Sequence, residues 1–136
     1  DELYNSEKCI VLFPAGLVSR RQKNKEIKDL EWKKSFITKA KKYNKTIIPV
    51  HVQGLNSSKF YNLSYWRKKL GIKLNIEMLF LADEMFKQSG ATITFTFGKP
   101  ISPNILTNEL TDLEWAQKIK NHVYELENNP NFELTT

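Results

Sequence analysis

A turn near the start of the chain carries groups that could bind an anion. It follows an apolar run and combines a flexible glycine, a hydroxyl and two guanidinium groups; its residues are Phe13, Pro14, Gly16, Ser19, Arg20 and Arg21. Gly16 can adopt a positive φ that exposes backbone amides, and arginine forms paired hydrogen bonds to carboxylate or phosphate. The pattern is also that of an ordinary strand exit with surface arginines. That second interpretation is the default unless other motifs accompany the turn.

The elements around this turn predict a βαβ unit. Residues 9–13 form a continuous apolar run, residues 30–43 carry aromatic side chains at helical spacing, and residues 46–52 are rich in β-branched side chains. This order predicts two parallel strands joined by a right-handed crossover. Pro49 lacks a backbone donor, so the second strand should end, bulge or form an edge there. We expect the turn and this strand to lie side by side and to form an electropositive groove.

The remaining segments predict three helices and one further strand. Residues 59–70 and 75–88 should be helical, and residues 91–97 alternate apolar and threonine side chains, which predicts a strand buried on one face. Thr111–Glu114 matches a capping box that starts the last helix. We therefore expect an α/β fold with a mixed, mostly parallel sheet flanked by helices. No repeat or internal linker divides residues 1–136, which predicts one domain with one core.

Composition adds a strong charge asymmetry. Between Arg20 and Lys45 there are eleven Lys or Arg against three Asp or Glu, a local balance of +8, although the whole chain carries only +6. One face should therefore attract anions, unless these lysines simply solvate a helix. The single cysteine, Cys9, excludes an internal disulfide and favours a reducing compartment. No apolar stretch reaches the roughly 18 residues that a bilayer span needs.

A second basic segment is mixed with aromatic rings. Its residues are Lys59, Phe60, Tyr61, Tyr65, Trp66, Arg67, Lys68 and Lys69. Such a mixture suits a membrane interface, where rings lie at headgroup depth and cations meet anionic lipid. An equal alternative is that about half of the aromatics belong to the core. The same residues could also contact phosphates and stack on bases, so a nucleic-acid or anion binding module is the rival function.

Four motifs together resemble those of the glycerolipid acyltransferases. They cover roughly residues 9 to 102 in the family's order: Phe-Pro-x-Gly-x-x-Ser at 13–19, Trp32-Lys33-Lys34, Ile47-Ile48-Pro49-Val50 and Gly98-Lys99-Pro100-Ile101. The form with Ala15 is similar to bacterial hemolysin-like acyltransferases associated with ornithine-type lipids and lysophospholipids. The resemblance implies an acceptor site that contains Phe13, Pro14, Gly16, Ser19 and Pro49.

The chain departs from this family in two respects. Ala15 replaces a glutamate, and Leu17-Val18 replace Thr-Arg, so Arg20 or Arg21 would have to supply a displaced guanidinium. The resemblance implies that the general base is a histidine followed five positions later by an aspartate. His51 is followed at that offset by an asparagine, and His122 should be a surface or interface residue of a helix. We expect no catalytic residue in this chain, with the His-Asp block upstream of Asp1.

The resemblance implies an acyltransferase that moves a fatty acyl group to a lysolipid or amino-acid-lipid acceptor. Acyl-CoA or acyl-carrier protein would be the cosubstrate, and no metal or tightly held cofactor is expected. Residues 1–136 would form the C-terminal part of one acyltransferase domain, inactive alone. We expect it to act peripherally at the cytoplasmic face of an anionic membrane in bacteria, without nucleic acid as a partner.

Overall fold

The computed structural model describes residues 1–134, which divide into two compact units. The first unit contains Asp1–Leu17, Glu31–Gln53 and the chain from Phe95 onward. The second contains Val18–Leu30 and Gly54–Thr94. Among the described residues, no helix is both long and apolar enough to span a bilayer.

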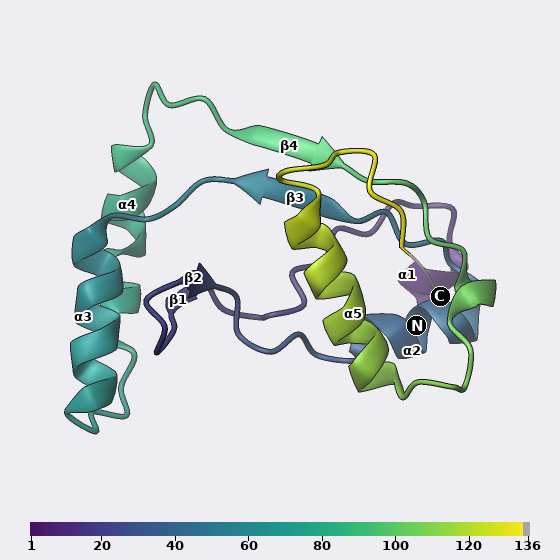
Figure 1. Cartoon of the computed structure of the whole chain (residues 1–136), viewed down its shortest axis with the longest axis horizontal. Helices are drawn as coiled ribbons and strands as arrows, with labels where there is room; N and C mark the ends of the chain where they lie inside the picture. Colours follow the sequence, from purple (N-terminus) through teal and green to yellow (C-terminus); the bar gives the residue numbers. More distant parts are fainter. Residues whose placement is uncertain (135–136) are drawn as a thin grey trace. The chain divides into compact units, whose positions relative to one another are not determined.

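The first unit is built from helices and one pair of strands (Figure 1). Its elements are α1 (Glu2–Asn5), α2 (Ser35–Tyr43), β3 (Val50–Gln53), β4 (Thr94–Phe97), the 3₁₀ helix η2 (Pro103–Ile105) and α5 (Asp112–Glu125). The expected capping box at the start of α5 is present, because Thr111 accepts from the amide of Glu114 and the Glu114 carboxylate accepts from the amide of Thr111. The predicted crossover helix begins at Ser35, not at residue 30, and ends at Asn44 in the left-handed conformation.

The expected parallel pairing is wrong. β3 pairs with β4, and the two strands run antiparallel (Figure 1). The pairing extends to an antiparallel bridge in which Ile47 and Ile101 exchange hydrogen bonds of 3.0 and 2.8 Å. Residues 9–13 form no strand, and Val11 and Phe13 are mostly exposed. The α/β class is confirmed, but both described sheets are two-stranded and antiparallel.

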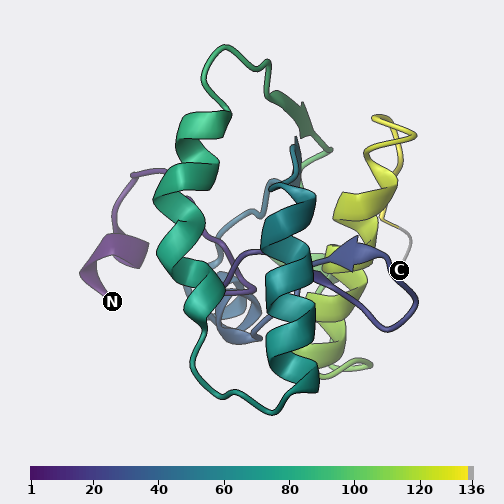
Figure 2. The same cartoon turned by 90° about the vertical axis from the view of Figure 1, so that its left-hand side faces the viewer.

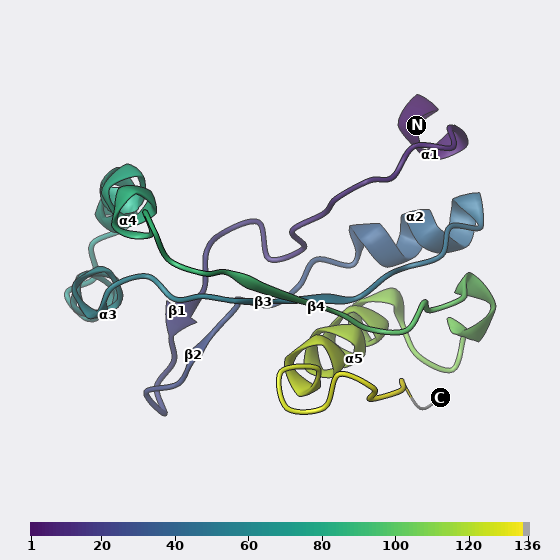
Figure 3. The ribbon, with the colours of Figure 1, turned by 90° about the horizontal axis from the view of Figure 1, so that it is seen from above.

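A close approach of backbone and side chains fixes the end of the β3–β4 pair. Gly98 donates a 2.9 Å hydrogen bond to the carbonyl of Pro49. A Cβ atom on Gly98 would lie 3.0 Å from the Pro49 ring and 2.8 Å from a methyl group of the buried Leu126. Gly98 and Pro49 therefore serve the junction between the strand pair and the chain just after α5. Figure 3 shows β3 and β4 edge-on with α5 beside them.

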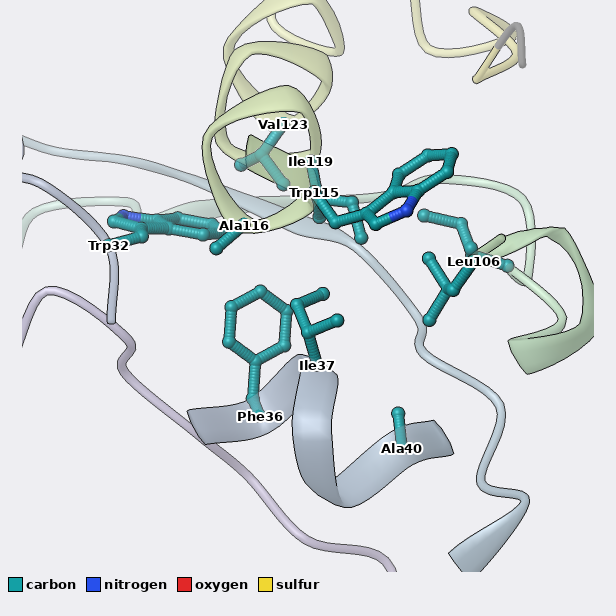
Figure 4. Close-up of a cluster of buried hydrophobic side chains, with 10 residues drawn as sticks. Trp32, Phe36, Ile37, Ala40, Leu106, Trp115, Ala116, Ile119 and Val123 are labelled. Atoms are coloured by element: carbon teal, nitrogen blue, oxygen red, sulfur yellow. The ribbon is translucent and has the colours of Figure 1, made fainter. Parts of the chain in front are cut away.

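The hydrophobic core of the first unit lies between α2 and α5. Phe36 and Ile37 project from α2 towards Trp115, Ala116 and Ile119 of α5 (Figure 4). The indole nitrogen of Trp115 donates a 2.9 Å hydrogen bond to a backbone carbonyl, so its polar atom is satisfied within the core. The helical spacing of apolar side chains in α2 and α5 supplies the buried face that each helix contributes to this core.

The second unit contains a small hairpin and two packed helical segments. Its elements are β1 (Arg20–Arg21), β2 (Ile27–Lys28), α3 (Ser58–Lys69), the 3₁₀ helix η1 (Ile76–Phe80) and α4 (Leu81–Lys87). The helices expected at 59–70 and 75–88 are confirmed, the second as a 3₁₀ turn that continues into α4. Figure 2 shows α3 and α4 side by side. Only residues 94–97 of the strand expected at 91–97 are extended in a ladder.

Glu84 links α4 to the start of α3. Its buried carboxylate accepts hydrogen bonds from the amide of Ser57, from the Ser57 hydroxyl at 2.7 Å and from Lys87 Nζ at 2.8 Å. Ser57 is also the N-cap of α3. The Lys87 ammonium and the Ser57 amide together lower the pKa of Glu84 to about 2. The helix start and the carboxylate thus stabilise one another.

Acid should weaken the second unit through Glu84. Because its folded pKa lies below the usual 4.5, the contribution of Glu84 to stability is present above about pH 4.5 and is lost as the pH falls towards 2. We expect a loss of about 1–2 kcal/mol, which allows for solvent screening of the ammonium partner. The measurement is amide hydrogen exchange of α3 against pH. The Glu84→Gln variant should lack this part of the pH dependence; an unchanged profile would contradict the assignment.

Candidate functional site

The predicted turn lies in the first unit and is tightly folded. The amide of Gly16 donates a 3.0 Å hydrogen bond to the carbonyl of Phe13, and the Pro14 carbonyl accepts from the amide of Lys33 at 3.0 Å. Gly16 has φ +68°, and a Cβ atom there would lie 3.2 Å from Lys33 Nζ. A glycine is therefore needed at this position, as the sequence indicated. The Phe13 ring is 81% exposed, so the turn presents an unpacked aromatic surface.

Ser19, Arg20 and Arg21 belong to the second unit, so the structure divides the predicted site residues between two bodies. The Ser19 hydroxyl shares a 3.1 Å hydrogen bond with the hydroxyl of Tyr61. The same Tyr61 oxygen accepts from the amide of Asn56 at 3.1 Å. Tyr61 is buried, so it fixes Ser19 against the start of α3.

Arg20 is committed to the interior of the second unit. One guanidinium nitrogen lies 3.1 Å from Glu77 Oε1, and another donates to the carbonyl of Val18 at 3.0 Å. The guanidinium also lies 5.6 Å from the centre of the Phe60 ring. Burial lowers the pKa of Arg20 below its ordinary value while Glu77 opposes that shift, and an arginine in this setting stays charged. Arg20 therefore has little capacity left for a substrate.

Glu77 is the centre of this buried network. Its carboxylate is fully buried and lies 2.7 Å from Arg67 Nε, in addition to its contact with Arg20. The hydroxyl of Ser64 donates to it at 3.3 Å. Burial raises the pKa of Glu77, but its own backbone amide and the two guanidinium groups outweigh burial and hold the pKa below its ordinary value. Two cations and one anion thus share the space between β1, α3 and η1.

Sequence reasoning did not identify Glu77 or Tyr61 as residues that position the predicted site. A signal for Glu77 was present, since it is the only acidic residue between Glu31 and Asp83. A buried cation between residues 32 and 82 therefore has no other carboxylate near it in the sequence.

Arg21 differs from its neighbour. It pairs with Ile27 across the β1–β2 hairpin and is half-buried. Its Nε atom is buried without a hydrogen-bond partner, and Arg21 forms no ion pair within residues 1–134. Arg21, rather than Arg20, therefore keeps guanidinium donors that a bound anion could use.

Neither histidine is part of a general-base pair of the expected kind. The ring of His51 lies in β3, with its Nε2 atom 3.9 Å from the exposed carboxylate of Glu127, which is too long for a hydrogen bond. His122 is buried, so the expectation of a surface or interface position is wrong. Burial lowers the pKa of His122, and its ring nitrogens have no hydrogen-bond partner among the described residues. The centre of its ring lies 5.4 Å from that of the Phe132 ring.

Half of the aromatic residues of the basic segment belong to the interior. Phe60 and Tyr61 are buried, whereas Tyr65 and Trp66 are exposed. Only the second pair could therefore contact a membrane or a nucleic-acid base. Within residues 1–134, no group of three or more His, Cys, Asp or Glu side chains is placed to hold a metal ion.

Comparison with known proteins gives one consistent result. The family model described as acyltransferase matches residues 1–132. Two lyso-glycine lipid O-acyltransferases, from Phocaeicola vulgatus and Bacteroides thetaiotaomicron, are each 50% identical to this chain over 123 residues, or 90% of it. The chain spans less than half the length of these relatives, 44% and 45%. No solved structure matches it significantly. The chain belongs to the acyltransferase family.

Proposed function

We propose that the protein containing this chain transfers a fatty acyl group from a thioester donor to the hydroxyl of a lysolipid whose headgroup carries an amino-acid carboxylate. The observation that carries this proposal is the 50% identity, over 90% of the chain, to two enzymes named for O-acylation of a lyso-glycine lipid. Acyl-CoA or acyl-carrier protein is the proposed donor. The reaction takes place at the cytoplasmic face of the membrane, where the protein is peripheral.

The chemistry divides between this chain and the rest of the protein. The acceptor hydroxyl attacks the thioester carbonyl, an ester C–O bond forms, the C–S bond breaks, and the thiol leaves with one proton. The base that takes the hydroxyl proton is supplied by a part of the protein outside this chain. This chain binds the acceptor, and Arg21 offers a guanidinium to the carboxylate.

An exchange of segments tests the proposal. In the B. thetaiotaomicron relative, the matched segment is replaced by the corresponding residues of this chain, and acyl transfer to lyso-glycine lipid is measured as thiol release. We expect the chimera to retain the activity, because half of the residues are identical. The chain alone should give no turnover with the same substrates.

The matched control replaces the same segment by a scrambled sequence of the same composition. A chimera that folds but acylates lyso-glycine lipid no faster than this control would contradict the proposed acceptor class. Turnover by the isolated chain would contradict the claim that the general base lies elsewhere.

A further inference from the structure

The segment formed by η1 and α4 buries charged side chains and exposes apolar ones. Its two buried positions are both glutamates, Glu77 and Glu84, seven residues apart and so on one side of the helical segment. The exposed positions include its largest apolar side chains: Leu79 (82%), Phe80 (49%), Met85 (64%) and Phe86 (70%). A helix that faces water normally shows the opposite arrangement. Residues 1–134 therefore leave the apolar side of this segment uncovered.

The inward direction of both glutamates is built into the second unit. Glu77 holds Arg20 and Arg67, and Glu84 accepts from Ser57 and Lys87. A rotation that buried Phe86 and Leu79 would break both sets of contacts. The exposure of the apolar residues is therefore a fixed property of the fold.

The loop between α3 and η1 continues this apolar exposure. Leu70, Ile72 and Leu74 are all exposed, although the loop is held in place. Arg67 donates to the carbonyl of Ile72 at 2.6 Å and to the side chain of Asn75 at 2.9 Å. An ordered loop that presents three aliphatic side chains outward is suited to contact with a nonpolar phase.

Charge identifies the covering partner. From residue 58 to residue 76 the chain has five basic residues and no acidic one. Arg67 is neutralised by Glu77, whereas Lys68, Lys69 and Lys73 form no ion pair within residues 1–134. Lys69 Nζ lies 4.9 Å from the centre of the exposed Trp66 ring. Lysines beside a tryptophan and outward aliphatic groups match the headgroup region of an anionic bilayer, where lysine stems extend along apolar material.

We propose that this surface docks on an anionic lipid bilayer. The docking face consists of Leu70, Leu74, Leu79, Phe80, Met85 and Phe86, and Lys68, Lys69 and Lys73 are its basic partners. The apolar side chains enter the interface, and the lysines contact lipid phosphates. The proposal rests on the proposed function in one respect, because an acceptor that is a membrane lipid requires the enzyme to reach the bilayer. It is tested without acyl transfer.

The test is co-sedimentation of the 136-residue chain with vesicles. We expect binding to mixed phosphatidylglycerol–phosphatidylcholine vesicles and weaker binding to phosphatidylcholine alone. Leu79→Ser with Phe86→Ser should weaken binding by about tenfold or more, because two exposed apolar groups no longer enter the lipid. Leu70→Ser with Leu74→Ser should act in the same direction. Lys68→Gln with Lys69→Gln should remove most of the preference for anionic vesicles.

The matched control is Val11→Ser with Phe97→Ser, which removes two similarly exposed apolar side chains from the first unit. It should bind as the unchanged chain does, and circular dichroism verifies that every variant is folded.

Equal binding by the control and the docking-face variants, or no binding to either kind of vesicle, would overturn the proposal. Self-association that disappears in the Leu79/Phe86 variant, without vesicle binding, would assign the face to a second copy. If the chain bound no vesicles but the chimera still acylated detergent-dispersed acceptor, the docking proposal would fail and the proposed function would stand.

Discussion

Replacing Glu77 by alanine should lower the free energy of unfolding of the second unit by about 3–5 kcal/mol, since it leaves two buried guanidinium groups without their common anion. Arg20 and Arg67 are both about 10% exposed at the side chain, and Glu77 is fully buried between them. Water cannot easily replace the lost carboxylate at that depth. The measurement is the urea dependence of amide hydrogen exchange in α3, which packs on both β1 and η1.

The control for this prediction is Glu26→Ala. Glu26 also pairs with a cation of the second unit, Lys28 at 3.1 Å, but both side chains are about half exposed. Exposed pairs of this kind contribute little, so the control should change stability far less than Glu77→Ala does. If Glu77→Ala were no more harmful than Glu26→Ala, the network would not hold the unit together.

Local signals in the sequence predicted most of the helices. The capping box at Thr111 and the apolar spacing of α2 and α5 depend on neighbours within a few residues, and the structure contains them as expected. The glycine turn at Gly16 was predictable for the same reason, because a positive φ favours glycine regardless of the rest of the fold.

Strand pairing could not be predicted in the same way. The apolar run at 9–13 is typical of a buried strand, yet within residues 1–134 it has no ladder partner, while β3 takes β4 as its neighbour. A strand becomes part of a sheet only when another strand offers matching donors and acceptors, and that partner is a tertiary property. Pro49 illustrates the point: β3 begins just after it, at Val50, as its missing donor predicted, but the close approach of Gly98 to its ring could not be predicted from local spacing.

The same limit applies to the two adjacent arginines. Arg20 and Arg21 are equivalent in sequence, and both were assigned to an acceptor site. Their roles separate only because Glu77, which lies 57 positions after Arg20, folds back against one of them. Alternation along β1 sends the two side chains to opposite faces, so only one can reach the buried carboxylate. Arg21 is left with a buried Nε atom that has no partner among the described residues.

In the chimera with the B. thetaiotaomicron relative, Arg21→Ala should lower kcat/KM for lyso-glycine lipid by about 10- to 100-fold, which corresponds to the loss of one charge-assisted contact to a carboxylate. The loss should be expressed mainly in the KM of the acceptor, and the KM of the thioester donor should stay nearly unchanged. Thermal unfolding should also be nearly unchanged, since Arg21 forms no ion pair within residues 1–134.

Arg20→Ala in the same chimera is the matched comparison, because it removes the same side chain one position earlier. It should lower stability instead, because it removes one of the two cations that neutralise Glu77. The free energy of unfolding should fall by about 2–4 kcal/mol, and kcat/KM per folded molecule should be unchanged. Arg21→Lys should recover part of the acceptor affinity, because a point charge remains without the paired geometry of the guanidinium. If Arg21→Ala raised the KM of donor and acceptor equally, or if Arg20→Ala gave the larger loss of kcat/KM in folded protein, the assignment of the acceptor contact to Arg21 would be wrong.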